Sequence, residues 1–170
     1  MLKWLFGDKT ANRDSNVAPP PTETTSPNEF EMFSRTATLV VFDLECLKHR
    51  MQDNVDWWAE PADEVKELHE RNLLIAGLGA NDWYDVRVIE ESLDAGQSFS
   101  LSFPSGEVFV GPGEEITGGG DEPTGVHGGK FFAFEPGDYK VELRRCDQAI
   151  DLSFTPAAPF SNSHSGPVTI

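Results

Sequence analysis

Hydrophobic and polar residues alternate with a period of two along most of the chain from residue 73 onward. This period places successive side chains on opposite faces of an extended strand, so it predicts strands rather than helices. The clearest case is residues 98–103, where Phe99, Leu101 and Phe103 alternate with serines. Further strands are predicted at residues 36–42, 73–78, 83–89, 107–110, 130–134, 139–143 and 149–154.

Two pairs of these strands are predicted to form hairpins, because short turn sequences separate their members. The sequence Gly-Ala-Asn-Asp separates strands 73–78 and 83–89, and Glu-Pro-Gly-Asp separates strands 130–134 and 139–143. Both are rich in residues that tight turns favour. About seven or eight short strands with this spacing indicate a mainly β, α+β fold, either an antiparallel β-sandwich or a strongly curved sheet.

One main helix is predicted at residues 61–72. Pro61 suits the first helical position, acidic residues follow in the first turn, and basic residues occupy the last turn. We expect Asn72 to end this helix in the left-handed conformation. Earlier in the chain, Asp43 is expected to cap a short helical turn.

The composition divides the chain into four parts. Residues 1–9 are a short apolar segment that includes Trp-Leu-Phe at positions 4–6, and they are too short for a secretory signal. Residues 10–32 are rich in Pro, Thr and Ser, and they are predicted to be a flexible linker because they bury too little to offset their ordering entropy. The β-rich domain is predicted at residues 33–155, followed by a loose tail at residues 156–170.

The net charge is the most unusual feature of the composition. The chain has 29 acidic and 13 basic side chains, with a formal net charge of −16 at pH 7. A protein this negative repels phosphate backbones and anionic lipid headgroups, which argues against nucleic-acid and membrane partners, and it attracts basic proteins. The same charge also favours solubility, so both interpretations stay open. No apolar run is long enough to span a membrane, and the expected location is the cytoplasm.

The sequence contains no recognisable catalytic or cofactor motif. The four histidines lack metal-site spacing, and neither Gly-x-Ser-x-Gly nor Cys-x-x-Cys occurs, so Cys46 and Cys146 are expected to be reduced. The glycine-rich loop at residues 111–129 lacks the lysine of a phosphate-binding loop. We therefore expect no enzyme activity, no cofactor and no metal. The weaker alternative is calcium held by carboxylates of this loop, where His127 is the one histidine that merits a test.

Two acidic segments are the candidate site for a protein partner. The first is Asp56, Trp57 and Trp58, because adjacent tryptophans rarely both point inward, and a tryptophan exposed among carboxylates has the composition of a protein-binding hot spot. The alternative is that both tryptophans pack on neighbouring elements. The second segment is the glycine-rich loop, which carries four carboxylates: Glu114, Glu115, Asp121 and Glu122.

Several stretches together resemble a known group of proteins. They are Ala-Thr-Leu-Val-Val-Phe-Asp at 37–43, Asp-Trp-Trp at 56–58, Ser-Gly-Glu-Val-Phe-Val-Gly at 105–111 with Glu-Glu at 114–115, and Pro-Gly-Asp-Tyr-Lys-Val at 136–141. They resemble small bacterial proteins of uncharacterised function that include immunity proteins of polymorphic or secreted toxin systems. The Pro-Gly-x-Tyr hairpin is also similar to that of the competence-type nuclease inhibitors. The resemblance spans about residues 36–154 and implies no catalytic residues.

The resemblance implies a protein that neutralises a toxin by tight binding. Many toxin domains are nucleases and are basic, so an acidic protein can associate with them quickly. We therefore expect a non-enzymatic acidic binding protein, an immunity protein that contacts a basic protein partner. The alternative is a scaffold or accessory module whose residues 1–9 bind another protein.

Overall fold

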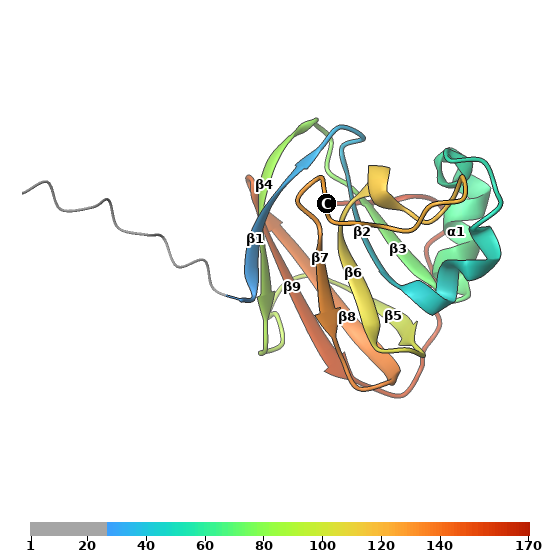
Figure 1. The fold of residues 1–170 in the computed structure, drawn as a ribbon. Helices are drawn as coiled ribbons and strands as arrows, with labels where there is room; N and C mark the ends of the chain where they lie inside the picture. Colours follow the sequence, from blue (N-terminus) through green and yellow to red (C-terminus); the bar gives the residue numbers. More distant parts are fainter. Residues whose placement is uncertain (1–26) are drawn as a thin grey trace, which may run out of the picture.

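The structure, a computed structural model, describes residues 27–170, which form two sheets packed face to face (Figure 1). Sheet A contains, in spatial order, β1 (Glu29–Ser34), β4 (Asp82–Ile89), β9 (Ala149–Pro156), β8 (Gly137–Cys146) and β5 (Gln97–Phe103). Sheet B contains β10 (Val168–Thr169), β3 (Leu73–Gly77), β2 (Thr38–Asp43), β6 (Glu107–Pro112) and β7 (Lys130–Ala133). The mainly β, α+β fold expected from the sequence is confirmed. Neighbouring strands are antiparallel except in the β4–β9 and β3–β10 pairs.

The main core lies between the two sheets. Every second residue of β5 points into it, and Phe99, Leu101 and Phe103 are fully buried. Strand β2 is buried on both faces, because Leu39 and Val41 belong to this core while Val40 and Phe42 face the other way. Its β-branched, apolar sequence matches that position, since a strand covered on both sides has no polar face.

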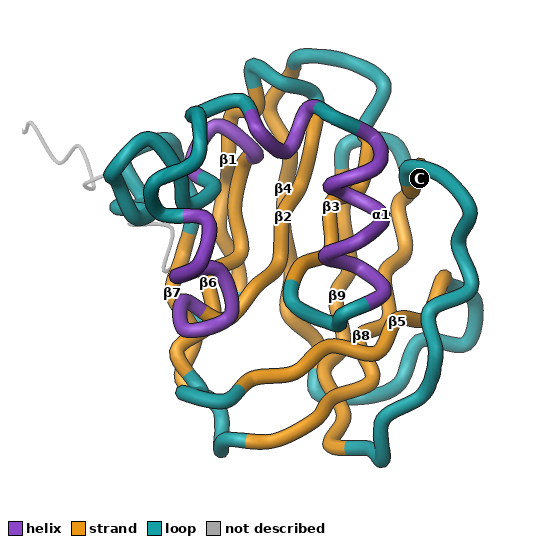
Figure 2. Tube along the Cα trace, turned by 90° about the vertical axis from the view of Figure 1, so that its right-hand side faces the viewer, coloured by secondary structure: helices purple, strands orange, loops and turns teal. Residues whose placement is uncertain are grey.

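A layer of helices covers the outer face of sheet B (Figure 2). It contains the 3-10 helices η1 (Leu44–Arg50), η2 (Trp57–Ala59) and η3 (Gly113–Glu115) and the α-helix α1 (Pro61–His69). A second core between this layer and the sheet contains Val40, Phe42, Leu47, Trp57, Leu73, Ile75, Phe109 and Ile116. Helix α1 begins at Pro61 as expected, but Arg71 rather than Asn72 takes the left-handed conformation after it, with φ 65°. None of the helices in residues 27–170 has the length and apolar character to cross a membrane.

Both predicted hairpins are wrong. Strands β3 and β4 are consecutive in sequence, yet β3 pairs with β2 and β10 in sheet B while β4 pairs with β1 and β9 in sheet A. Likewise, β7 belongs to sheet B and β8 to sheet A. The burial of the strands gives the reason for the first case. Strand β3 is buried on both faces whereas β4 exposes alternate residues, so each fits a different layer of the sandwich.

The ends of the domain also differ from the expectation. Strand β1 lies partly inside the predicted linker at residues 10–32, because Phe30 and Met32 alternate with glutamates and pack into the core. The predicted loose tail at residues 156–170 contains β10 and lies against the domain. Asn162 is buried there, and its amide group donates to the carbonyls of Leu68 (2.6 Å) and Ser100 (2.9 Å). The predictions for residues 1–9 and 10–26 concern residues that the structure does not describe.

Candidate functional site

The helical layer and the loop beside it form an acidic lobe, defined as residues 44–69, which contain η1, η2 and α1, together with residues 113–122. Asp43 attaches the start of this lobe to the sandwich. Its Oδ1 accepts a hydrogen bond from the amide of Glu45 (2.9 Å), which confirms the expected cap of η1. Its Oδ2 accepts from the amides of Ser105 (3.0 Å) and Gly106 (2.8 Å) in the turn between β5 and β6. Gly106 has φ 76°, and a Cβ there would lie 2.1 Å from the carbonyl oxygen of Phe134, so the turn requires glycine.

Trp57 joins η2 to the loop. Its side chain is part of the second core with only 6% of the residue exposed, and its Nε1 donates to the carbonyl of Thr117 (2.9 Å). A Cβ at Gly118 would lie 3.0 Å from the indole, so the loop passes close to the ring. Trp58 is half-buried and packs against the same core. Both tryptophans therefore pack on neighbouring elements, and neither presents a fully exposed ring to a partner.

Glu114 and Glu115, two of the predicted partner-binding residues, form hydrogen bonds inside the domain instead. Glu114 accepts from the amide of Arg35 and the hydroxyl of Thr36, both at 2.9 Å. Glu115 is buried, and it accepts from three backbone amides of the loop that follows, namely Thr124 (2.9 Å), Gly125 (2.5 Å) and His127 (2.9 Å). These two carboxylates order the glycine-rich loop, since each satisfies backbone donors that would otherwise lack partners.

The two acidic segments selected from the sequence lie side by side in the structure. The amide of Gly119 donates to the carbonyl of Asp53, and the amide of Gly120 donates to the carbonyl of Met51, both at 2.8 Å. The loop and the segment before η2 therefore form one continuous surface. Three of the seven predicted residues are exposed carboxylates on it: Asp56, Asp121 and Glu122.

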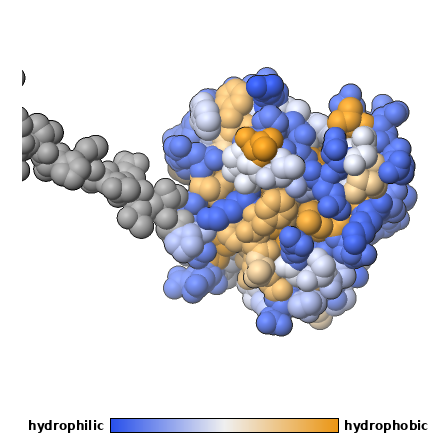
Figure 3. All heavy atoms as spheres, in the orientation of Figure 1, coloured by the Kyte–Doolittle hydropathy of each residue, from blue (hydrophilic) through white to orange (hydrophobic). Residues whose placement is uncertain are grey.

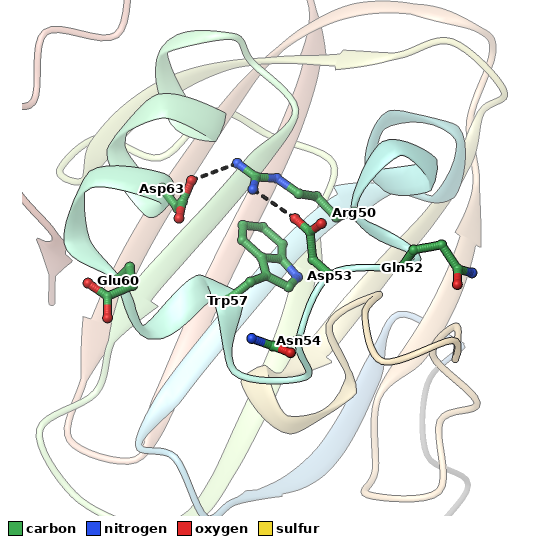
Figure 4. A pocket seen from close by; sticks show the side chains of 7 residues that line it. All are labelled: Arg50, Gln52, Asp53, Asn54, Trp57, Glu60 and Asp63. Carbon is green, nitrogen blue, oxygen red and sulfur yellow. Dashed lines mark hydrogen bonds and ion pairs between the residues drawn. The ribbon is translucent and has the colours of Figure 1, made fainter.

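An open cavity of about 430 Å³ lies between η1, η2 and α1 (Figure 4). The guanidinium of Arg50 is part of its wall, 4.4 Å from the centroid of the Trp57 ring. Three carboxylates surround this guanidinium. Nε donates to Glu67 (2.8 Å), Nη1 to Asp53 (2.9 Å) and Nη2 to Asp63 (2.9 Å). The lining consists of Arg50, Gln52, Asp53, Asn54, Trp57, Glu60 and Asp63.

Glu67 is the buried member of this cluster. Burial alone would raise its pKa, but hydrogen bonds from Asn72 (2.8 Å), His49 (3.0 Å) and Arg50 outweigh burial and hold the pKa of Glu67 below its usual value. Glu67 therefore stays ionised. Together with two aspartates it gives the cluster three negative charges against one positive charge.

The arrangement suits the binding of a cationic group. The Asp53 and Asp63 side chains are 40% and 39% exposed, and each uses only one oxygen on Arg50, so the other oxygen can accept from a ligand. Glu60 adds a further carboxylate to the lining. Because Arg50 already directs its donors to three acids, it offers little to an anion.

Sequence reasoning missed most residues of this cavity. Arg50 and Asp53 are three positions apart, and Asp63 and Glu67 are four positions apart on α1. The second spacing places Asp63 and Glu67 on one face of α1, and the first allows Arg50 and Asp53 to meet across the turn that follows η1, so the sequence does contain a signal for each pair. The meeting of the two pairs depends on how η1 and α1 pack together, and no local pattern predicts that.

The calcium alternative gains no support from the geometry. Within residues 27–170, no three His, Cys, Asp or Glu side chains come together as metal ligands. The oxygens of Glu114 and Glu115 are engaged by the hydrogen bonds given above, and His127 is exposed.

Cys46 is half-buried and donates to the carbonyl of Ser102 (3.3 Å). Burial raises the pKa of its thiol to about 12, which favours the protonated thiol at neutral pH.

Comparisons with known proteins place the chain in a family. The structure described as crocagin biosynthetic gene J is similar, with a TM-score of 0.51 and 14% identity over 77% of this chain and 97% of that chain. ComJ from Bacillus subtilis, described as an inhibitor of the DNA-degrading activity of NucA, has a TM-score of 0.45 and 11% identity over 76% of this chain and 95% of that chain. No curated protein sequence matches the chain. The model of a family of unknown function, DUF6386, matches residues 26–170, and the chain belongs to this family.

Proposed function

We propose that this chain is a non-enzymatic inhibitor, of the immunity-protein type, that neutralises a basic protein by binding it through the acidic lobe. The observation that carries the proposal is the open cavity between η1, η2 and α1. Its one basic side chain, Arg50, is saturated by three carboxylates, while Glu60 and the free oxygens of Asp53 and Asp63 remain available. A lysine or arginine of a partner would find acceptors there without displacing an internal contact.

The distribution of charge supports a role in fast association. Residues 1–26 contain three acidic and three basic side chains, so the net charge of −16 resides in residues 27–170. A field of one sign accelerates the encounter with an oppositely charged protein and is screened by salt. Asp56, Asp121 and Glu122 extend the negative surface from the cavity across the neighbouring loop.

The chemistry of the cavity favours binding over catalysis. The lining contains amides, carboxylates, one arginine and one tryptophan, and it includes no serine, cysteine, histidine or lysine, so its carboxylates are the only groups that could serve as nucleophiles. Asp53 and Asp63 are held by Arg50, which orients them toward a cationic ligand.

The test is neutralisation of the protein encoded beside this chain. The two are co-expressed, and growth and co-purification are measured. The quadruple variant Asp56→Asn, Glu60→Gln, Asp121→Asn and Glu122→Gln removes four charges from the lobe. Asp56 and Glu60 make no side-chain cap hydrogen bond, so this variant should fold. The matched control removes four exposed charges of the same types outside the lobe: Asp94→Asn, Asp147→Asn, Glu91→Gln and Glu135→Gln.

We expect the wild type and the control to rescue growth and to retain the partner, and the quadruple variant to lose both. Equal rescue by the two variants would remove the acidic lobe from the interface. A neighbouring protein that is harmless and does not bind would contradict the inhibitor role itself.

A shortened chain separates the inhibitor from the scaffold alternative. A chain that begins at Pro27 keeps β1 and removes the apolar segment at residues 1–9. If the acidic lobe binds the partner, this shortened chain still rescues growth. If residues 1–9 bind the partner, rescue is lost.

A further inference from the structure

The outer face of β1 and β4 carries an aromatic pair, in which Trp83 is exposed and Phe33 is half-buried. Phe33 and Trp83 lie directly opposite each other in the β1–β4 register, with ring centroids 5.4 Å apart. Trp83 is 60% exposed, although tryptophan is among the side chains that gain most from burial. The two strands that carry the pair, β1 and β4, lie on the side of the sandwich away from α1 (Figure 1).

An acidic pair lies next to these rings on the same face. Glu31 and Asp85 are the next outward-facing partners in the register, and both are exposed. Like charges directly opposite each other destabilise a sheet. In the described part of the chain, neither carboxylate forms an ion pair with a lysine or arginine that would relieve this repulsion.

Beyond the acidic pair, the surface changes character. Glu29 lies opposite Arg87, and the guanidiniums of Arg87 and Arg144 both bind the buried carboxylate of Asp151 (2.6 Å each). Glu31 and Asp85 therefore lie between the aromatic rings on one side and the ion pairs of Arg87 and Arg144 with Asp151 on the other.

A second hydrophobic area, over β6 and β7, is visible at the centre of Figure 3. Its exposed ring, Phe131, is 37% exposed and packs on the core residue Phe109 with centroids 5.2 Å apart. That ring is partly covered by the domain itself and has no charged pair in register beside it. The β1–β4 face combines a more exposed ring with a defined charge.

We propose that the Phe33–Trp83 and Glu31–Asp85 pairs form a second docking surface, which binds a cationic segment of a protein partner. One apolar side chain of that segment packs on the two rings, and a lysine or arginine two residues along it lies between the two carboxylates. The spacing fits because residues i and i+2 of an extended segment share a face and are about 7 Å apart, as are successive same-face pairs of β1 and β4. The cation removes the repulsion between Glu31 and Asp85, so complex formation relieves a strain that the free domain carries.

The probe is the blocked peptide acetyl-Phe-Thr-Lys-Thr-amide, which places its apolar and cationic side chains on one face. Binding is followed by the NMR shifts of the Trp83 indole N–H and of the Glu31 and Asp85 amides. The charge-reversed peptide acetyl-Phe-Thr-Glu-Thr-amide is the control ligand. We expect saturable shifts with the first peptide and none with the second.

Two variants test the surface, and a third controls for net charge. Trp83→Ala and the double variant Glu31→Gln, Asp85→Asn should each weaken peptide binding at least fivefold. The double variant Asp56→Asn, Glu60→Gln removes the same charge from the acidic lobe and should leave binding within twofold of wild type. All these positions are exposed, and unchanged amide spectra outside the substituted region establish that the variants fold.

The proposal is overturned if the wild type gives no saturable shift, if the charge-reversed peptide binds equally well, or if the acidic-lobe control loses as much affinity as the β1–β4 variant. It is also overturned if sedimentation shows a dimer that Trp83→Ala dissolves, because the occupant would then be a second copy of this chain. These outcomes do not depend on the acidic lobe, so failure here leaves the proposed inhibitor function standing, and the converse also holds.

Discussion

Two tryptophans in acidic surroundings differ in their exposure to solvent: one is buried and the other is exposed. Trp57 has aspartate immediately before it in sequence and three carboxylates around the Arg50 beside it, yet it is 6% exposed and hydrogen-bonded. Trp83 lies between Asp82 and Tyr84 in sequence and is 60% exposed. The composition around Trp57 predicted a hot spot, and the structure has the expected combination of exposed ring and acids at Trp83 instead.

The difference shows which neighbours decide exposure. Trp57 is in a short 3-10 helix over the second face of a doubly covered sheet, so its ring fills the space between the helical layer and β2. Trp83 is on the outward side of a strand whose other side is buried. The residues next to each tryptophan in sequence do not predict its exposure, because contacts across strands and between layers set the environment of the ring.

The largest expected effect contrasts the two rings directly. Trp57→Ala leaves a cavity in the second core and releases the loop at residues 113–122, so it should reduce the free energy of unfolding by about 3–5 kcal/mol. Trp83→Ala removes only a surface pair and should cost less than about 1 kcal/mol. Denaturant unfolding of both variants measures the difference. Similar losses for the two would show that the rings do not occupy different environments.

The buried carboxylate of the Arg50 cluster, Glu67, should contribute to the free energy of unfolding in a pH-dependent way. Because hydrogen bonds lower the pKa of Glu67 in the folded state, this group stabilises the fold above its unfolded pKa of about 4.3, and that contribution is lost as pH falls through the folded value. Glu67→Gln should therefore cost about 2 kcal/mol at neutral pH, where Arg50 keeps its other two acids.

The pH dependence sharpens this prediction. The difference in stability between the wild type and Glu67→Gln should shrink as the pH falls below about 4.3. Urea unfolding at a series of pH values measures it. A difference that stayed constant from pH 7 to pH 3 would mean that the charge of Glu67 contributes nothing to the cluster.

The smallest effect should have the opposite sign. Asp85→Asn removes one of two like charges that face each other across β1 and β4, so it should stabilise the domain by about 0.2–1 kcal/mol. Thermal unfolding measures this as a rise in Tm. The exposed control Asp147→Asn has no cross-strand partner of like charge and should leave Tm unchanged. A decrease in Tm for Asp85→Asn would show that the carboxylate has a stabilising partner.

Much of the fold was predictable because burial leaves its period in the sequence. The alternating residues of β5, the doubly buried β2, the start of α1 at Pro61 and the cap at Asp43 all follow local rules. The pairing of the strands was not predictable, because tight-turn residues after β3 and β7 lead the chain from one sheet to the other rather than into a hairpin. Strand β1 was missed because it follows directly on a Pro-, Thr- and Ser-rich stretch.

The candidate site was predictable only as a region. The segments around residues 56–58 and 114–122 do meet, but Glu114 and Glu115 face inward to bind backbone amides, which a count of carboxylates cannot reveal. Arg50, which lines the cavity, is held by two acids of α1, Asp63 and Glu67, and by Asp53 in the segment after η1. The identity of the acids that remain free depends on which hydrogen bonds the folded backbone needs.

The rate of association with the basic partner tests the central claim most directly. We would measure the association rate constant at low and at physiological salt for the wild type, the quadruple lobe variant and its matched four-charge control. We expect the lobe variant to associate at least tenfold more slowly than the control at low salt, with the gap narrowing as salt screens the charges. Equal rate constants for the two variants at both salt concentrations would contradict the account.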